Sequence, residues 1–106
     1  MSEARTIYVT AADEGQAATL ARTLLERRLI ACANVLPGMR SFYRWQGAVQ
    51  DEGEVAMLLK TAASRVDAVI AAVEELHAYE TPCVVVWPIE AGSRAYLDWV
   101  VTESVG

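Results

Sequence analysis

Few side chains in this 106-residue chain could carry chemistry. Cys32 and Cys83 are its two cysteines, and His77 is its one histidine. Because the sequence has no Cys-x-x-Cys pair, it offers no self-contained zinc site. A Cys32 thiolate would suit copper, which accepts soft ligands. His77 and Glu80 are three residues apart, so both could reach one cation if they share the last turn of a helix.

Each of these candidates also has a purely structural interpretation. A histidine near a helix C-terminus is favoured by the helix dipole, and buried cysteines often behave as small, inert hydrophobic residues. Spacing alone favours these structural roles, whereas ligands shared between chains would favour a metal site. The candidate metal ligands are therefore Cys32, His77 and Glu80, and their geometry decides between the two interpretations.

The sequence lacks the signatures of common enzymes. It has neither a nucleophile elbow nor a glycine-rich phosphate loop, and one histidine is too few for most acid–base sites. Lys60 ends an apolar segment and could extend to solvent. Alternatively, it could contact a carboxylate such as Glu54, Glu80 or Glu90. We expect a protein that is not an enzyme.

Hydrophobic periodicity indicates the elements that must position these residues. Residues 5–11 alternate between apolar and polar side chains, as in a half-buried strand. Asp13 can cap the next helix, with Gln16 reaching back to complete a capping box. Ser64 and Asp67 repeat this pattern before a second helix. The expected strands cover residues 5–11, 30–45 (interrupted at Pro37-Gly38), 49–61 and 83–87, and the expected helices cover residues 13–28, 64–80 and 94–103.

This order of elements, with two right-handed crossovers onto one sheet, predicts an α+β fold. We expect a ferredoxin-like βαββαβ sandwich with a long hairpin between the second and third strands and a C-terminal helix. The chain should form one domain over residues 1–106. The expected strand order, 4-1-3-2, places Cys32 and Cys83 at opposite edges, roughly 14 Å apart. A disulfide tolerates only about 7 Å between Cα atoms, so none is expected.

Composition suggests that part of the surface is buried against another chain. Counted with Gly and without Tyr, apolar residues make up 59 of 106, about 56%, above the ~45–50% usual for globular proteins on the same definition. The long hairpin carries Phe42, Tyr43 and Trp45, and a long aromatic edge strand tends to pair with another chain. Tyr96 and Trp99 belong to a last helix that is apolar around most of its circumference. We expect a tight homo-oligomer with the hairpin and this helix at the interface.

Other partners and locations are disfavoured. No apolar run approaches the ~18 residues of a membrane-spanning helix. The first residues lack the basic and apolar segments of a secretory signal, so we expect a cytoplasmic protein without membrane contact. A chain of net charge −5 without a basic run is a poor partner for nucleic acid.

Several motifs follow one another along the chain in a known order. Residues 29–35 match a strand of the form LAACVN, and residues 38–47 match a hairpin of the form G-x-x-S-x-Y-x-W-x-G. Residues 77–82 match H-P-Y-E-x-P, with Ala78 in place of the first proline. Further matches are Glu54, Lys60-Thr61, Pro88-Ile89, Gly92 and residues 96–99. Together these motifs resemble the CutA family of divalent-cation tolerance proteins.

The resemblance implies a ferredoxin-like protomer in a very stable homotrimer, with an architecture similar to that of PII signalling proteins. It implies a role in tolerance to copper and other divalent cations, with no established enzymatic activity. Copper or another divalent cation would be a possible ligand, though not an obligatory one, with Cys32 at the family's recurring cysteine. Residues expected in the cleft between subunits are Trp45, Glu54, Lys60, Tyr79, Tyr96 and Trp99.

Two features of the resemblance leave the function open. Ala78 departs from the family pattern and leaves His77 freer to stay helical. Direct metal binding also has an alternative, a PII-like module whose inter-subunit clefts hold a small molecule or a partner protein.

Overall fold

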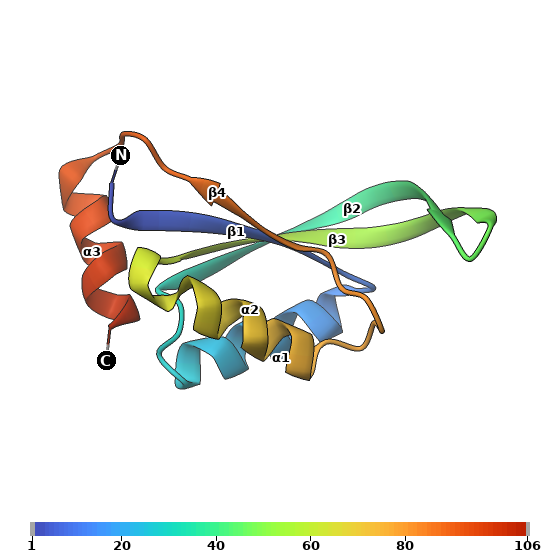
Figure 1. The fold of residues 1–106 in the computed structure, drawn as a ribbon, viewed down its shortest axis with the longest axis horizontal. Coiled ribbons are helices and arrows are strands. Elements are labelled where there is room, and N and C mark those ends of the chain that lie inside the picture. Colours follow the sequence, from blue (N-terminus) through green and yellow to red (C-terminus); the bar gives the residue numbers. More distant parts are fainter. Residues whose placement is uncertain (1, 106) are drawn as a thin grey trace.

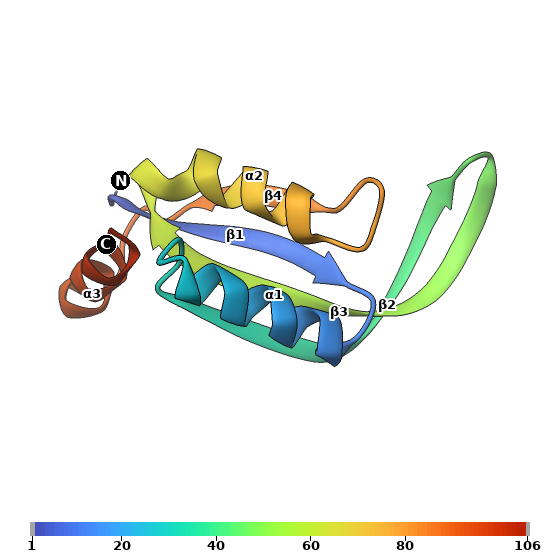
Figure 2. The same cartoon turned by 90° about the horizontal axis from the view of Figure 1, so that it is seen from below.

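The computed structural model describes residues 2–105 and shows a four-stranded antiparallel sheet with two helices packed on one face (Figures 1 and 2). A third helix lies at one end of the sheet, near both ends of the chain (Figure 1). The strands are β1 (Ala4–Ala11), β2 (Cys32–Trp45), β3 (Ala48–Ala62) and β4 (Val84–Pro88), and the helices are α1 (Glu14–Glu26), α2 (Val66–Leu76) and α3 (Arg94–Ser104). The domain expected over residues 1–106 includes Met1 and Gly106, which lie outside the described residues. Among the helices of residues 2–105, none is long and apolar enough to cross a membrane.

The strand order β2-β3-β1-β4 is the order expected from the sequence, and the ferredoxin-like fold is confirmed. β1 lies inside the sheet, where Val9 pairs with Met57 of β3 and with Val84 of β4. Cys32 begins β2 and Cys83 immediately precedes β4, so the two cysteines lie toward opposite edges. Both thiols are free, in agreement with the absence of a disulfide expected from this order.

Local sequence explains how α1 begins but not how α2 begins. Asp13 accepts a hydrogen bond from the Gln16 backbone N–H at 2.8 Å, and Gln16 Oε1 accepts one from the Ala12 N–H at 3.3 Å. The capping box expected at Ser64 and Asp67 is wrong. A 3₁₀ turn, Ala63–Arg65, leads into α2, whose first turn has no side-chain cap. Since this turn already continues the backbone hydrogen bonding, the Ser64 side chain is not at the helix start.

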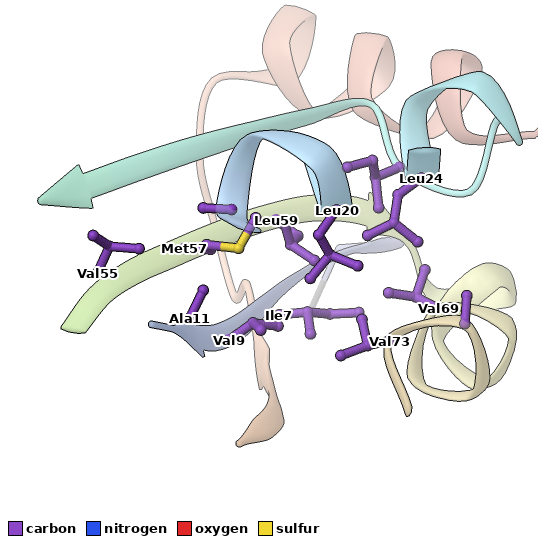
Figure 3. Packing of buried hydrophobic residues seen from close by; sticks show 13 residues of the cluster. Ile7, Val9, Ala11, Leu20, Leu24, Val55, Met57, Leu59, Val69 and Val73 are labelled. Atoms are coloured by element: carbon purple, nitrogen blue, oxygen red, sulfur yellow. The ribbon is translucent and has the colours of Figure 1, made fainter. Parts of the chain in front are cut away.

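The core lies between the sheet and α1 and α2 (Figure 3). Alternate residues of β1 and β3 supply one side of it, and the apolar faces of the two helices supply the other. The buried set is Ile7, Val9, Ala11, Ala17, Leu20, Leu24, Ile30, Val55, Met57, Leu59, Val69, Ala72 and Val73. A smaller cluster of Ala4, Ala31 and Val100 anchors α3 to the end of the sheet.

The β2–β3 hairpin extends beyond the rest of the sheet (Figures 1 and 2). β1 ends level with Val55, so the outer part of the hairpin pairs only with itself. Gln46 and Gly47 both have positive φ (50° and 81°) at its tip, as a type I′ turn requires. The interruption expected at Pro37-Gly38 is a register shift between Leu36 and Met39, and β2 continues through it as one strand.

Candidate functional site

α1 and α2 lie on one face of the sheet (Figure 2). The opposite face, called the open face below, carries exposed apolar side chains. Its residues alternate with the core residues of each strand. Tyr8 of β1 and Trp87 of β4 stack on this face, with ring centroids 5.2 Å apart. Leu36, Val85 and Trp87 are 46%, 45% and 47% exposed. The open face is therefore an apolar surface left uncovered within one chain.

A cleft of about 590 Å³ adjoins the open face at the base of the hairpin. β1, the hairpin and the segment between α2 and β4 form its walls. Its lining residues are Tyr8, Thr10, Ser41, Phe42, Tyr43, Trp45, Glu54, Tyr79, Glu80, Thr81 and Cys83. Both ionised groups among them, Glu54 and Glu80, are carboxylates, and no lysine or arginine lines it; we call it the acidic cleft.

Glu54 is the buried charge of the acidic cleft, being only 9% exposed. It lies on β3 opposite Met39, where the register of the hairpin shifts. Its Oε2 accepts a hydrogen bond from the Tyr79 hydroxyl at 2.8 Å. Burial, together with this hydrogen bond, raises the pKa of Tyr79. The phenol therefore stays protonated and acts as a donor to the carboxylate.

Burial and the charge of Glu54 act on the pKa values of neighbouring groups in the acidic cleft. Burial raises the pKa of Cys83, and the charge of Glu54 raises it further. Burial also raises the pKa of Tyr8, with Cys83 and Glu54 adding to the effect. The Cys83 thiol is consequently neutral near pH 7, and a neutral thiol is a poor ligand for a metal ion.

His77 is held by two hydrogen bonds, one at each ring nitrogen. Nδ1 accepts from the Tyr79 backbone N–H at 3.0 Å, so Nε2 carries the proton and donates to the Thr10 carbonyl at 2.7 Å. α2 ends at Leu76, and His77 has an extended backbone (ψ 146°). The condition for His77 and Glu80 to reach one cation, a shared last turn of the helix, is therefore not met, because the chain leaves the helix at His77.

Cys32, Lys60, Tyr96 and Trp99 lie together at the α3 end of the sheet, far from the acidic cleft. The Cys32 Sγ contacts the Tyr96 hydroxyl at 3.4 Å, and the Tyr96 and Trp99 rings lie 5.8 Å apart. Contact with Cys32, together with burial, raises the pKa of Tyr96 to about 12. Lys60 donates to Asn34 Oδ1 at 3.2 Å and forms no ion pair within residues 2–105.

The three candidate metal ligands do not meet within one chain. Cys32 pairs with Lys60, whereas Thr10, which binds His77, pairs with Ala56. These two positions on β3 are four residues apart, or roughly 13 Å. Glu80 lines the acidic cleft, while His77 lines a separate cavity of about 330 Å³ beside α1. Over the described part of the chain, no group of three or more His, Cys, Asp or Glu residues is placed to hold a metal ion.

Within one chain, the residues predicted for the cleft between subunits likewise fall into two groups, and their meeting across subunits stays a prediction. Trp45, Glu54 and Tyr79 line the acidic cleft, whereas Lys60, Tyr96 and Trp99 belong to the α3 end. Sequence reasoning missed Tyr8 and Cys83 as cleft residues. The alternation of β1 places Tyr8 on the open face, but no local pattern links it to Cys83.

Known proteins resemble this chain over most of its length. The family model described as "CutA1 divalent ion tolerance protein" matches residues 5–103. The divalent-cation tolerance protein CutA of Thermus thermophilus is 42% identical over 94 residues, covering 89% of this chain and 91% of the relative. Mouse Protein CutA is also 42% identical and covers 92% of this chain, but the chain spans only 56% of that relative's length.

Solved structures agree with this assignment. A crystal structure of CutA from Xylella fastidiosa has a TM-score of 0.93 and 37% identity, covering 96% of this chain and 98% of its own. CutA from Archaeoglobus fulgidus, described as a periplasmic divalent cation tolerance protein, has a TM-score of 0.91 and 37% identity, covering 95% of this chain and 98% of its own. Since that relative is called periplasmic, a cytoplasmic location stays a prediction.

Proposed function

Because this chain belongs to the CutA1 family of divalent-ion tolerance proteins, we propose that it contributes to divalent-cation tolerance as a non-enzymatic homotrimer that binds copper or a similar cation weakly. The observation that carries this proposal is the negative electrostatic character of the chain. Its net charge is −5, and the ionised groups of its larger cleft are two carboxylates. Such a field attracts cations without selecting among them.

Self-association is supported by the large apolar surface that one chain leaves exposed. Trp87, Val85 and Leu36 lie on the open face and are each nearly half exposed. A sheet face with several large exposed apolar side chains is typical of protein interfaces. We expect the trimer to bury these side chains of the open face. Each chain would contribute one domain to it.

Weak metal binding is supported by the positions of the proposed ligands. Cys32, His77 and Glu80 would have to come from different subunits to share an ion, since one chain keeps them apart. Coordination by His77 would also displace a hydrogen bond from one of its nitrogens. Both requirements reduce the net free energy of binding.

The absence of catalysis is supported by the same histidine. General-base catalysis needs an imidazole nitrogen within reach of a substrate proton. Both nitrogens of His77 are engaged with the backbone, at Thr10 and Tyr79. The two carboxylates of the acidic cleft have no imidazole among the residues that line it.

Isothermal titration calorimetry with CuCl₂ tests the metal proposal. We expect weak, stoichiometric binding by the unmodified protein, loss of binding in Cys32→Ser, and retained binding in the matched control Cys83→Ser. Retained binding in Cys32→Ser would contradict the role of Cys32. Absence of binding in all three proteins would contradict direct copper binding.

One observation favours a second candidate function, the binding of a small molecule. The acidic cleft has a volume of about 590 Å³ and an aromatic lining. Binding sites for small molecules typically have ~300–1,000 Å³ and a largely apolar lining with a few polar groups. In this alternative, the effect on metal tolerance would be indirect.

A further inference from the structure

The acidic cleft attracts cations in general, but it has room for a ligand much larger than a metal ion. Its volume of about 590 Å³ compares with ~30 Å³ for one water molecule in the liquid. Glu54 and Glu80 are the two carboxylates that line it, and Cys83 adds a thiol whose pKa is raised by burial. A cation that fills this space must therefore be a molecule with a hydrocarbon part in addition to its charged group.

Glu54 has an acceptor atom that the protein leaves free. Its Oε2 accepts from Tyr79, whereas Oε1 has no hydrogen-bond partner within residues 2–105. The residue is nevertheless about nine-tenths buried, with 9% of its surface exposed. No buried side-chain oxygen or nitrogen of the described residues lacks a hydrogen-bond partner, so the unpartnered Oε1 is an atom that solvent reaches. The free oxygen of Glu54 is therefore an accessible acceptor, on a largely buried carboxylate, for a positively charged donor.

Aromatic side chains supply the complementary apolar surface. Tyr8, Phe42, Tyr43, Trp45 and Tyr79 all line the acidic cleft. Aromatic faces attract ammonium and guanidinium groups through cation–π interactions. They also pack against the hydrocarbon part of a ligand.

We propose that the acidic cleft binds an organic cation, a primary ammonium or guanidinium group on a hydrocarbon body, with the cation donating to Glu54 Oε1. Glu80, which is exposed, adds a second negative charge to the lining. The hydrocarbon body packs among the aromatic residues. This inference specifies the second candidate function and does not depend on copper binding.

Protonation states in the cleft agree with such a ligand. The raised pKa values of Tyr8, Tyr79 and Cys83 keep these groups neutral near pH 7. The phenols and the thiol therefore add hydrogen-bonding and apolar surface, while the negative charge is confined to the carboxylates.

Titration with phenethylamine, followed by NMR chemical shifts of the full chain at pH 7, tests the proposal. The matched neutral ligand is 2-phenylethanol, which replaces the ammonium group by a hydroxyl. We expect saturable shifts for phenethylamine at residues of the acidic cleft, with at least about tenfold weaker binding of 2-phenylethanol. Equal binding of the two ligands would overturn the proposal, because the cleft would then select only for hydrophobicity.

Substitution of the two cleft carboxylates shows whether they are responsible for the binding of phenethylamine. Glu54→Gln keeps an acceptor for Tyr79 but removes the charge, and we expect phenethylamine binding to weaken by about tenfold or more. Glu80→Gln should weaken it by a smaller factor, since Glu80 is exposed. The control Glu26→Gln removes one charge from the exposed surface of α1 and should leave binding unchanged.

Two outcomes of the variant experiment would contradict the proposal. One is unchanged binding in both Glu54→Gln and Glu80→Gln. The other is equal weakening in Glu26→Gln, which would show that only net charge matters. If Glu54→Gln fails to fold, the comparison of Glu80→Gln with Glu26→Gln still shows whether a carboxylate in the cleft, rather than net charge, supports binding of phenethylamine. A failed copper titration would leave this proposal standing, and a failed amine titration would leave direct copper binding standing.

Discussion

The two faces of the sheet carry similarly apolar residues but differ in how far these residues are buried within one chain. On the helix-covered face, Ile7, Val9 and Met57 are fully buried by α1 and α2. On the open face, Trp87 and Val85 remain nearly half exposed although they are just as apolar. The covered face holds one chain together, whereas the open face is available for contact with other chains. Apolar residues in a sheet therefore do not by themselves identify its core.

The same division applies along the sheet. At the α3 end, Cys32 and Tyr96 contact each other beside a helix that packs against the sheet. At the hairpin end, Glu54 and Tyr79 line a cleft that stays open. The hairpin end holds the buried carboxylate Glu54 among aromatic residues, and the ligand proposed above is placed there for that reason.

Leu24→Ala tests the covered face and should have the largest effect. Leu24 is fully buried in the main core, and truncation of such a leucine costs about 3 kcal/mol of unfolding free energy. Chemical denaturation at a fixed protein concentration should show this loss, while the mass of the assembly under native conditions stays the same. A loss well below 1 kcal/mol would show that this face is not the principal core.

Trp87→Ala tests the open face. Large aromatic residues at the centre of an interface commonly contribute about 2 kcal/mol or more to association. Light scattering after size-exclusion chromatography should therefore show weakened assembly. The matched control is Leu25→Ala, which removes a similarly exposed apolar side chain (41% against 47%) from the opposite side of the molecule. Equal effects of the two substitutions would contradict the special role of the open face.

Cys83 provides a smaller, pH-dependent test at the acidic cleft. Burial and the charge of Glu54 raise its pKa above the ordinary value of 9.0, so the reactive thiolate forms only at higher pH. In a Cys32→Ser background, the rate of alkylation by iodoacetamide should rise with an apparent pKa above 9.0. Glu54→Gln should lower that pKa only in part, because burial is the larger cause. An apparent pKa at or below the ordinary value would contradict the negative potential of the cleft.

Local patterns in the sequence were sufficient for the fold. Alternation in β1 identified its two faces, and Asp13 with Gln16 identified the start of α1. They were insufficient at the end of α2. There the helix ends at Leu76, and His77 binds the carbonyl of Thr10, a residue 67 positions earlier. Spacing along the chain carries no information about such a contact.

The candidate site was only partly predictable for the same reason. Glu54 and Tyr79 were expected in one cleft, and they share a hydrogen bond across 25 positions of sequence. Lys60 and Tyr96 were expected in the same inter-subunit cleft. Within one chain the register of β2 on β3 places them at the opposite end of the sheet, so a cleft shared between subunits stays a prediction. Family motifs identify the candidate site residues, whereas strand register determines which of them lie close together within one chain.

Sedimentation equilibrium of the unmodified protein at micromolar concentration tests most directly the claim that the open face is an interface. One chain has a mass of 11.6 kDa. The proposed homotrimer predicts a single species of three times that mass, stable on dilution. A species of 11.6 kDa at the same concentration would contradict it, because the apolar residues of the open face would then remain in contact with water.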